Sequence, residues 1–349
     1  MILLRNLNLA CRGLRKLAAT ALLSFAVLSP GWMSPALAQS LKDSNCTGRS
    51  DIPADQQISG CNEAIASGRF AAKDLAAAFN NRGVAYQAKG DLDRAIADYG
   101  QAISVSPDYA MAHSNRGQAY QLKGDNDRAL ADYDAAIKID PNYARAYDNR
   151  GSVYGNRGDP DRAIADYDQA IRLDSSLAHA YSNRGSAYAD KGDYDRAVAD
   201  LNQAIHLDPN SVQSYYDRGV AYSLKKDYDR AIADYDQAIR LQPGLTLAWS
   251  NRGMAYMGKN DPDHAMADYS EAIRLNPKFA IAFNNRGTTF VRKKDYARAI
   301  ADYTEAIRLD PDYAAALFRR GIVRRLNGDK AGGDADVAAA RKLDPELAE

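Results

Sequence analysis

The chain has 349 residues, and its 45 basic residues are balanced by 45 acidic ones. Hydrophobic residues make up 46% of it, enough for a sizeable core at this length. The even mixture of charges gives no electrostatic case for binding nucleic acid, so we expect no nucleic-acid partner.

Residues 1–38 have the order of a secretory signal peptide. A leader with four basic residues and no acid precedes an apolar run at 17–28, and Ala-Leu-Ala follows at 36–38. The alternative is an uncleaved membrane anchor, but a spanning helix needs about 20 apolar residues, more than this run offers. We therefore expect cleavage after Ala38 and no span in the mature chain, whose net charge becomes −4. Export to the periplasm is predicted, with secretion as the alternative.

Two of the three cysteines, Cys46 and Cys61, remain after this cleavage. In an oxidising compartment two thiols form a disulfide by default, and two unpaired structural thiols are the alternative. Apolar residues at helical spacing predict one helix near 54–67. We expect residues 39–75 to cap the N-terminal end of the array that follows, with the disulfide tying the leading loop to that helix.

From Asn81 onward, the dipeptide Arg-Gly recurs every 34 residues, eight times in all. A self-similar unit of this length is a helix–turn–helix, and it must stack on its neighbours because it cannot bury its apolar face alone. The sequence therefore predicts an all-α solenoid that binds partners along a surface. Counted from Ala76, the eight copies are 76–109, 110–143, 144–177, 178–211, 212–245, 246–279, 280–313 and 314–347.

Small and large residues repeat at fixed places in the unit. Position eight is glycine in all eight copies, from Gly83 to Gly321, and position twenty-seven is alanine in all eight. Tyrosine is common at positions eleven and twenty-four. Glycine inside a helix costs about 0.5–1 kcal/mol relative to alanine, so its recurrence indicates a close approach of the partner helix. Rings that interlock with glycine and alanine predict a dense core between the two helices of each copy.

The helix boundaries are equally regular. Aspartate stands at position sixteen in every copy, where it predicts the N-cap of the second helix. Glycine precedes it in five copies, which fits a left-handed end to the first helix. Proline at position thirty-two ends the second helix in seven copies. In the eighth copy, polar residues such as Arg324, Asp334 and Arg341 replace apolar ones, as the terminus of a solenoid requires.

Together these positions resemble the tetratricopeptide repeat. That family has an aromatic at position four, glycine at eight, tyrosine at eleven, alanine at twenty and twenty-seven, and proline at thirty-two. The resemblance covers nearly the whole mature chain and implies a right-handed superhelical solenoid that binds proteins or peptides. One departure is position seven, usually leucine in the family, which is arginine in all eight copies.

The arginine at position seven is matched one for one by aspartate at position twenty-three, as in Arg82 and Asp98. We predict a ladder of Arg–Asp pairs between first and second helices, which fixes their register. The alternative is a basic stripe for anionic ligands, which an adjacent acid would neutralise.

In the family, first helices line the concave face, chiefly through positions two, five, nine, twelve and thirteen. Asparagine at position six forms, in some relatives, a ladder that holds the backbone of an extended peptide, since an amide both donates and accepts. The alternative is that each asparagine bonds a neighbouring helix. Carried over to this chain, the ladder is Asn81, Asn115, Asn149, Asn183, Asn251 and Asn285.

The character of the concave positions changes along the chain. Copies two to four offer mainly polar residues, such as Ser114, Gln118 and Asp148, whereas copies five to eight offer apolar ones. An apolar surface with Met and aromatic residues suits a helix or an apolar peptide, although some of these side chains could instead close the core. The predicted contact residues there are Tyr216, Val220, Leu247, Met254, Met257, Ile281 and Phe318.

Catalysis has little support in the sequence. The four histidines occupy different positions of the unit, so stacking does not gather them as metal ligands, and no nucleophile motif or phosphate loop is present. We expect no enzyme, no metal and no cofactor. The expected function is an exported scaffold that binds a protein or peptide partner through the concave face, in the assembly of an envelope or secretion complex. The alternative is a periplasmic carrier of an apolar peptide or small molecule in copies five to eight.

Overall fold

The computed structural model describes residues 45–47 and 51–347, and the regular structure in these ranges is entirely α-helical. The predicted signal peptide, residues 1–38, lies outside the described residues. The chain divides into two compact units, unit 1 ending at Lys191 and unit 2 beginning at Gly192.

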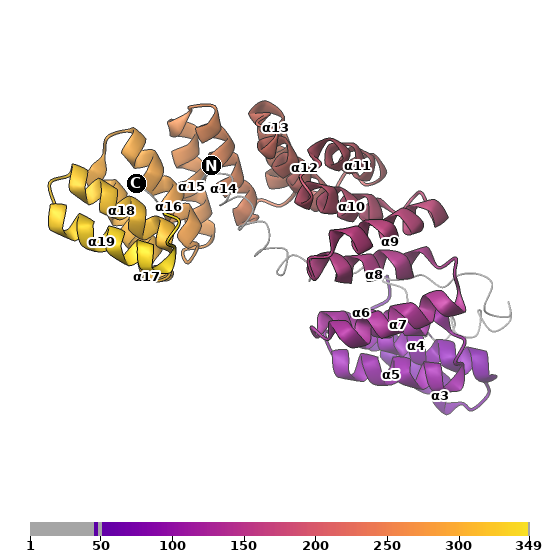
Figure 1. Ribbon diagram of the computed structural model, residues 1–349. Helices are drawn as coiled ribbons and strands as arrows, with labels where there is room; N and C mark the ends of the chain where they lie inside the picture. The colour runs from indigo at the N-terminus through magenta and orange to yellow at the C-terminus, as the bar shows by residue number, and fades with distance from the viewer. Residues whose placement is uncertain (1–44, 48–50, 348–349) are drawn as a thin grey trace. The chain divides into compact units, whose positions relative to one another are not determined.

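Unit 1 contains the predicted N-terminal cap and the helix pairs of the first copies (Figure 1). Its helices are α3 (Ala54–Ala66), α4 (Ala72–Ala88), α5 (Leu92–Val105), α6 (Ala110–Leu122), α7 (Asn126–Ile139), α8 (Ala144–Asn156), α9 (Pro160–Leu173) and α10 (Ala178–Asp190).

Unit 2 contains the remaining helix pairs. Its helices are α11 (Tyr194–Leu207), α12 (Val212–Leu224), α13 (Tyr228–Leu241), α14 (Thr246–Gly258), α15 (Pro262–Leu275), α16 (Ala280–Arg292), α17 (Tyr296–Leu309), α18 (Ala314–Leu326) and α19 (Lys330–Leu343).

The helices follow the repeat frame closely. From the second copy onward, every first helix begins at the first residue of its 34-residue copy, as α6 does at Ala110. Only α4 differs, because it begins at Ala72, four residues ahead of the frame at Ala76. The alanine-rich stretch before Ala76 contains no proline, and alanine favours the helix, so nothing stops α4 from starting early. Within each unit, helices adjacent in sequence pack on one another.

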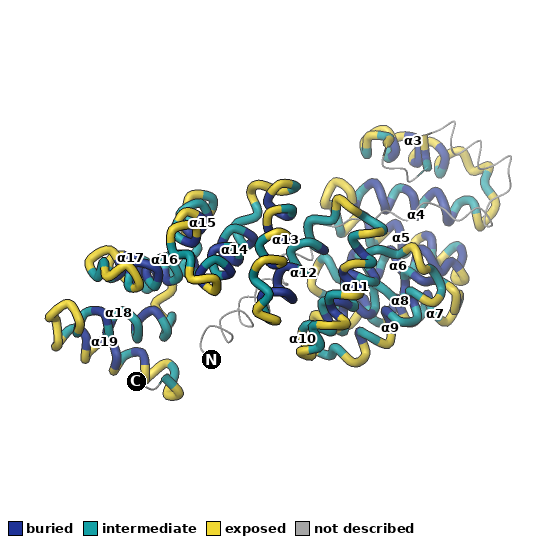
Figure 2. The backbone as a smooth tube through the Cα atoms, turned by 90° about the horizontal axis from the view of Figure 1, so that it is seen from above, coloured by how far each residue is buried: buried dark blue, intermediate teal, exposed yellow. Residues whose placement is uncertain are grey.

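In six copies the core lies between the two helices, where the tyrosine at position twenty-four meets the glycine at position eight. A Cβ built on Gly219 would lie 2.7 Å from Cε1 of Tyr235, and one on Gly83 would lie 2.7 Å from the same atom of Tyr99. Both rings are fully buried. The close approach predicted from the repeated glycine is therefore confirmed. Figure 2 shows the same pattern along the backbone, with buried stretches inside each hairpin and exposed ones at the turns.

The predicted N-caps are also confirmed. The carboxylate of Asp159 accepts a hydrogen bond from the backbone N–H of Arg162 at 3.1 Å, and the equivalent aspartates cap the other second helices of the eight copies in the same way. Each bond satisfies a backbone donor that the first turn of a helix leaves open.

The turn between the two helices of a copy needs one residue in the left-handed region. Glycine has this conformation at Gly90, Gly124, Gly158, Gly192 and Gly328. In copies five to seven the same place is held by Lys226, Asn260 and Lys294, with φ of 61–62°. A Cβ in this region costs about 1–2 kcal/mol, while a new glycine costs about 0.5–1 kcal/mol of extra entropy in the unfolded chain.

We therefore expect Lys294→Gly to stabilise unit 2 by about 0.5–1 kcal/mol. The urea midpoint of unfolding checks this, and the reciprocal change Gly124→Lys should lower the stability of unit 1. A fall in the midpoint for Lys294→Gly would contradict the explanation.

The predicted N-terminal capping segment is tied internally by a disulfide and contacts the first copy through polar and apolar groups. Cys46 and Cys61 form the predicted disulfide, and both are fully buried in a cluster with Ala64 and Ala78. The side-chain amide of Asn81 donates to the backbone carbonyl of Cys46 at 2.9 Å. The predicted helix is observed as α3, which packs on α4.

At the C-terminal end, ion pairs join side chains of α18 to side chains of α19. Arg324 Nη1 lies 3.0 Å from Asp336 Oδ2, and Arg325 Nε lies 2.7 Å from Asp334 Oδ1. A Cβ on Gly333 would lie 2.6 Å from the carbonyl oxygen of Gly321, so glycine allows these two helices to approach. The polar residues that break the repeat therefore serve contacts inside the last copy.

Candidate functional site

The predicted binding positions lie on the first helix of each copy. Successive first helices contact one another within a unit, α4 through α10 in unit 1 and α12 through α18 in unit 2. We call positions two, five, six, nine, twelve and thirteen of these helices the first-helix face. It is the surface on which side chains from different copies come together.

In unit 2 this face is partly apolar. Leu247, Met254, Ile281 and Phe318 come from three neighbouring first helices, and each is partly exposed. Tyr216 on α12 is also partly exposed. These five predicted contact residues can therefore reach a partner.

Two other predicted contact residues are buried. Val220 is 5% exposed, and Met257 is 8% exposed and packs in a cluster with Ala265 and Tyr269. Val220 stands at position nine of copy five and Met257 at position twelve of copy six, and both side chains fill space between helices. Their contribution is to the core of unit 2, and a partner cannot reach them without a local opening of the structure.

In unit 1 the face is polar, and its side chains bond one another. Gln87 Nε2 donates to Gln118 Oε1 at 2.9 Å, and Gln121 Nε2 donates to Ser152 Oγ at 3.4 Å. Buried tyrosines of the second helices also donate to these glutamines, as Tyr133 Oη does to Gln121 Oε1 at 2.9 Å. The glutamines thus link the core of one copy to the first helix of the next.

One carboxylate on this face is unlike the repeated aspartates. Burial raises the pKa of Asp148, while the amide of Asn183, 3.2 Å away, and the charges of His179 and Arg145 act in the opposite direction. Asp148 stands at position five, where other copies carry neutral residues. It gives unit 1 a local polar cluster that the repeat pattern does not explain.

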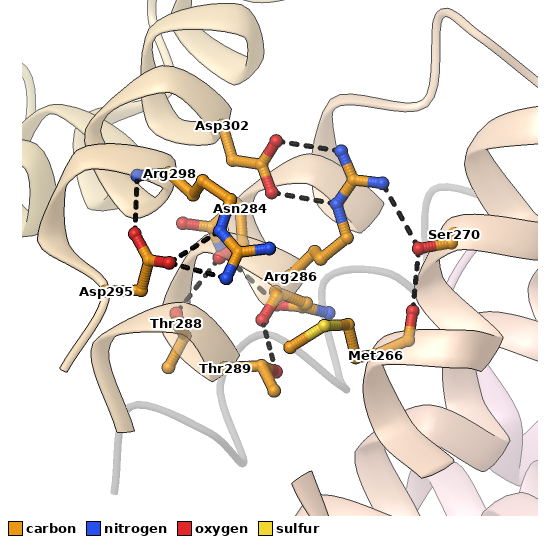
Figure 3. Close-up of polar contacts among 10 residues, drawn as sticks. Met266, Ser270, Asn284, Arg286, Thr288, Thr289, Asp295, Arg298 and Asp302 are labelled. Atoms are coloured by element: carbon orange, nitrogen blue, oxygen red, sulfur yellow. Dashed lines mark hydrogen bonds and ion pairs between the residues drawn. The ribbon is translucent and has the colours of Figure 1, made fainter. Parts of the chain in front are cut away.

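The predicted Arg–Asp ladder is confirmed for the seven pairs that lie within one unit. Each arginine at position seven grips the aspartate of its own copy with two nitrogens, as Arg286 does Asp302 at 2.8 and 2.9 Å (Figure 3). The pair Arg184 and Asp200 is divided between the units. The seven pairs have the same geometry.

A third nitrogen of the same arginine reaches the preceding copy. Arg286 Nη1 donates to Ser270 Oγ on α15, and Ser270 in turn donates to the carbonyl of Met266 (Figure 3). Arg150 makes the equivalent contact with Asp134 at 2.6 Å. Each such arginine therefore joins three helices, two of its own copy and one of the copy before. The sequence pattern predicted only the first two.

The asparagines at position six mostly bond the preceding first helix. Asn115 Nδ2 donates to Asn80 Oδ1 at 2.8 Å, and Asn251 Nδ2 donates to Tyr216 Oη at 2.9 Å. Asn183 and Asn81 donate in the same direction, to Asp148 and to the Cys46 carbonyl. These amide donors are used inside the fold, as the alternative interpretation expects.

Two of the six asparagines differ. Asn149 is partly exposed, and its side chain makes no hydrogen bond to the described part of the chain. The Nδ2 of Asn285 is buried without a partner, although its Oδ1 accepts from Asn284 Nδ2 at 3.1 Å. Ser250 Oγ and Asn284 Oδ1 are buried and unpartnered too. The chain of inter-copy bonds is therefore interrupted on α14 and α16, in the apolar half.

The described residues contain no group of three or more histidine, cysteine, aspartate or glutamate side chains that could hold a metal ion. Of the four histidines, His113 lies 3.4 Å from Asp132 Oδ1, and His264 lies 2.7 Å from Asp261 Oδ2. Both histidines thus contact aspartates that already have structural roles, in an Arg–Asp pair and in an N-cap.

Across residues 45–47 and 51–347, no helix has the length and apolar character needed to cross a membrane.

Comparison with known proteins agrees with this architecture. The tetratricopeptide repeat profile matches residues 149–211, 182–246, 250–314 and 284–347, and related repeat profiles match 83–124, 110–143 and 132–165. None of the curated proteins matches the sequence significantly.

Several solved structures are similar. A chain of the APC/C hetero-tetramer Cut9–Hcn1 is 17% identical with a TM-score of 0.63, covering 90% of this chain and 63% of that one. A tetratricopeptide repeat protein from Parabacteroides merdae is 19% identical with a TM-score of 0.53, covering 75% and 97%. YrrB, described as a TPR protein with an unusual peptide-binding site, is 27% identical with a TM-score of 0.45, covering 53% and 95%.

Proposed function

Because the chain belongs to the tetratricopeptide repeat family, we propose that it is an exported scaffold that binds a protein or peptide partner through its first-helix face. The apolar side chains on this face of unit 2 carry the proposal. By binding such a partner, the scaffold would bring together components of an envelope or secretion complex.

The contrast between the two helix sets supports this choice of face. Exposed acids of the second helices are paired with bases, such as Asp263 on α15 with Lys293 just after α16, and Glu305 with Arg308 on α17. On the first helices of unit 2, Leu247, Met254 and Phe318 remain partly exposed. Apolar side chains held at fixed spacing by a rigid scaffold suit the apolar side of a peptide or helix. Methionine adds adaptability, because its side chain is flexible and polarisable.

The disulfide supports the exported location. Disulfides persist in oxidising compartments and are rare where thiols are kept reduced. In this chain the bond between Cys46 and Cys61 ties the loop before α3 to that helix, within the predicted capping segment. The same two residues follow the predicted signal peptide, so sequence and structure favour the same compartment.

Cross-linking in the native cell tests the proposal. A photoreactive amino acid replaces Met254 or Phe318, and control probes replace Asn149 on the first-helix face of unit 1 and the exposed Ala301 on a second helix. We expect Met254 and Phe318 to capture one protein that Ala301 does not capture.

Three other outcomes would contradict parts of the proposal. Equal capture at Ala301 would show that the partner does not bind specifically at the first-helix face. Capture at Asn149 alone would show that the binding site lies in unit 1 and not in unit 2. A small molecule that co-purifies with the chain in stoichiometric amount, with no protein captured, would make it a carrier.

A further inference from the structure

The capping helix α3 has the sequence of a second helix. Residues 62–65 read Asn-Glu-Ala-Ile, and residues 270–273 of α15 and 304–307 of α17 read Ser-Glu-Ala-Ile and Thr-Glu-Ala-Ile. If the 34-residue frame is moved four residues toward the N-terminus, α3 begins at position seventeen, as the second helix of every copy does. Cys61 then stands at position twenty-four, where six copies carry tyrosine.

The polar contacts of α3 follow the same moved frame. Arg82 Nη1 donates to Asn62 Oδ1 at 2.7 Å across 20 residues, whereas the corresponding contact between later copies spans 16. Lys89 pairs with Asp55 across 34 residues, whereas the corresponding later pairs span 30. Both spans are longer by four, the number of residues by which α4 starts ahead of its frame. The helix α3 therefore docks on α4 as a second helix docks on the copy that follows it.

The first helix that should precede α3 is not formed around Cys46. In the moved frame residues 45–47 fall at positions eight to ten, inside the first helix, but they are not helical. Cys46 nevertheless takes the role of that helix toward α4. Asn81 donates to its carbonyl at 2.9 Å, as Asn115 donates to Asn80 on the preceding first helix at 2.8 Å. The bond from Cys46 to Cys61 thus lies where the glycine and the tyrosine meet in other copies.

Without that first helix, α3 has little to hold it in place. Its buried residues are Gln57, Gly60, Cys61 and Ala64, whereas α13 buries a tyrosine and an isoleucine besides its alanines. Its ion pair to Lys89 is exposed, and exposed pairs contribute little to stability. The contact with Arg82 uses a neutral amide as the acceptor. A covalent bond is the strongest constraint on the position of this helix.

We propose that α3 is the second helix of a truncated copy ahead of the eight, and that the disulfide takes the place of its first helix. Firm docking of α3 then requires oxidation of Cys46 and Cys61. The two sulfurs join by exchange with a disulfide-bearing oxidant, which takes up two electrons and two protons and leaves as two thiols. When the bond is reduced, α3 opens locally while the copies behind it stay folded. This redox sensitivity goes beyond the proposed function and does not depend on which partner the chain binds.

Hydrogen–deuterium exchange of the full chain, followed by mass spectrometry, tests this dependence. The bond is reduced with a phosphine in mild urea, which is then removed, and intact mass confirms two thiols. We expect residues 54–66 to exchange about tenfold faster or more after reduction, because the bond closes a loop of 15 residues. Residues 126–139 of α7 should exchange at an unchanged rate. The double variant Cys46→Ala with Cys61→Ala should behave like the reduced chain, which excludes an effect of the reductant.

A pair of charge variants tests the moved frame. Asn62→Asp gives Arg82 the acceptor that Arg150 has in Asp134, and a charge-assisted bond is stronger than a neutral one. In the reduced chain this variant should slow the exchange of residues 54–66 about threefold or more. Ser59→Asp adds the same charge to an exposed position of the same helix and is the matched control, with no slowing expected.

Each contrary result has a definite meaning. Equal exchange of residues 54–66 in the oxidised and reduced chains would show that α3 docks without the disulfide, and the proposed dependence on oxidation would be wrong. Equally faster exchange in α7 would show that the bond stabilises the array as a whole. Equal effects of Asn62→Asp and Ser59→Asp would show that α3 does not dock in the register of a second helix.

Discussion

Replacing Asp302 with alanine is expected to lower the free energy of unfolding of unit 2 by about 3 kcal/mol. The carboxylate is 7% exposed and binds Arg286 through both oxygens (Figure 3). Without it, the guanidinium keeps only a neutral contact, to Ser270. A charge left largely buried without its partner is more costly than the pair itself is favourable, so the loss exceeds that of a surface salt bridge.

The second residue of the pair provides the control. Arg286→Leu combined with Asp302→Ala removes both charges, and leucine is the usual residue at position seven in this family. We expect the double variant to recover most of the lost stability, because replacing a buried ion pair with apolar residues is often neutral. Urea unfolding followed by circular dichroism measures the parent chain and both variants. If the double variant were less stable than Asp302→Ala, the pair would not be the unit of stabilisation.

Acid is expected to unfold the array through its N-caps. The pKa values of seven capping aspartates are lowered, in six of them chiefly by the backbone N–H that each accepts, and in Asp227 chiefly by the Arg230 side chain. A lowered pKa means that the folded state binds these protons less tightly than the unfolded state. The stability they contribute is present above about pH 5 and is lost as the pH falls through the folded-state values below about 4.

A few carboxylates act in the opposite direction. Burial raises the pKa of Asp148, Asp234 and Asp268, so their protonation on acidification favours the folded state. The caps outnumber them and repeat in every copy, and we therefore expect the urea midpoint to fall steeply between pH 5 and pH 3. Urea is the suitable denaturant because it adds no salt that would screen the charges.

Asparagine at the caps separates the hydrogen bond from the charge. It accepts the same backbone bond but does not titrate, and it is an N-cap of equal preference. With Asp227, Asp261 and Asp295 all changed to asparagine, unit 2 should keep most of its stability at pH 7 and lose less on acidification than the parent chain. An identical fall in the midpoint for both chains would assign the acid sensitivity to other groups.

The repeat explains why so much of the fold could be predicted from the sequence. Eight copies act as their own alignment, so Gly219 opposite Tyr235, or Asp159 as a cap, is seen several times over in one chain. Features that depend on one copy alone were harder to predict. The early start of α4 at Ala72 follows from local alanine content, and the frame gave no sign of it.

The candidate site was less predictable for the same reason. A concave position can turn toward the core when its neighbour is small or a gap must be filled, as happens at Val220 and Met257. Position alone does not reveal this. The third contact of the arginine at position seven, as in Arg286 with Ser270, was not predicted, because the accepting position twenty-five differs from copy to copy.

The arginine that joins three helices has a consequence for how such a chain can evolve. Six of the seven junctions between copies use this third contact, and the accepting side chain can be aspartate, asparagine, serine or threonine. At the first junction Gly100 offers Arg116 no side chain. If residues 246–279 were deleted as a block, Arg286 would meet Asp236 in place of Ser270, and no junction would be left open. Duplication or loss of whole 34-residue copies can therefore lengthen or shorten the first-helix face, while the arginine at each new junction still finds an acceptor.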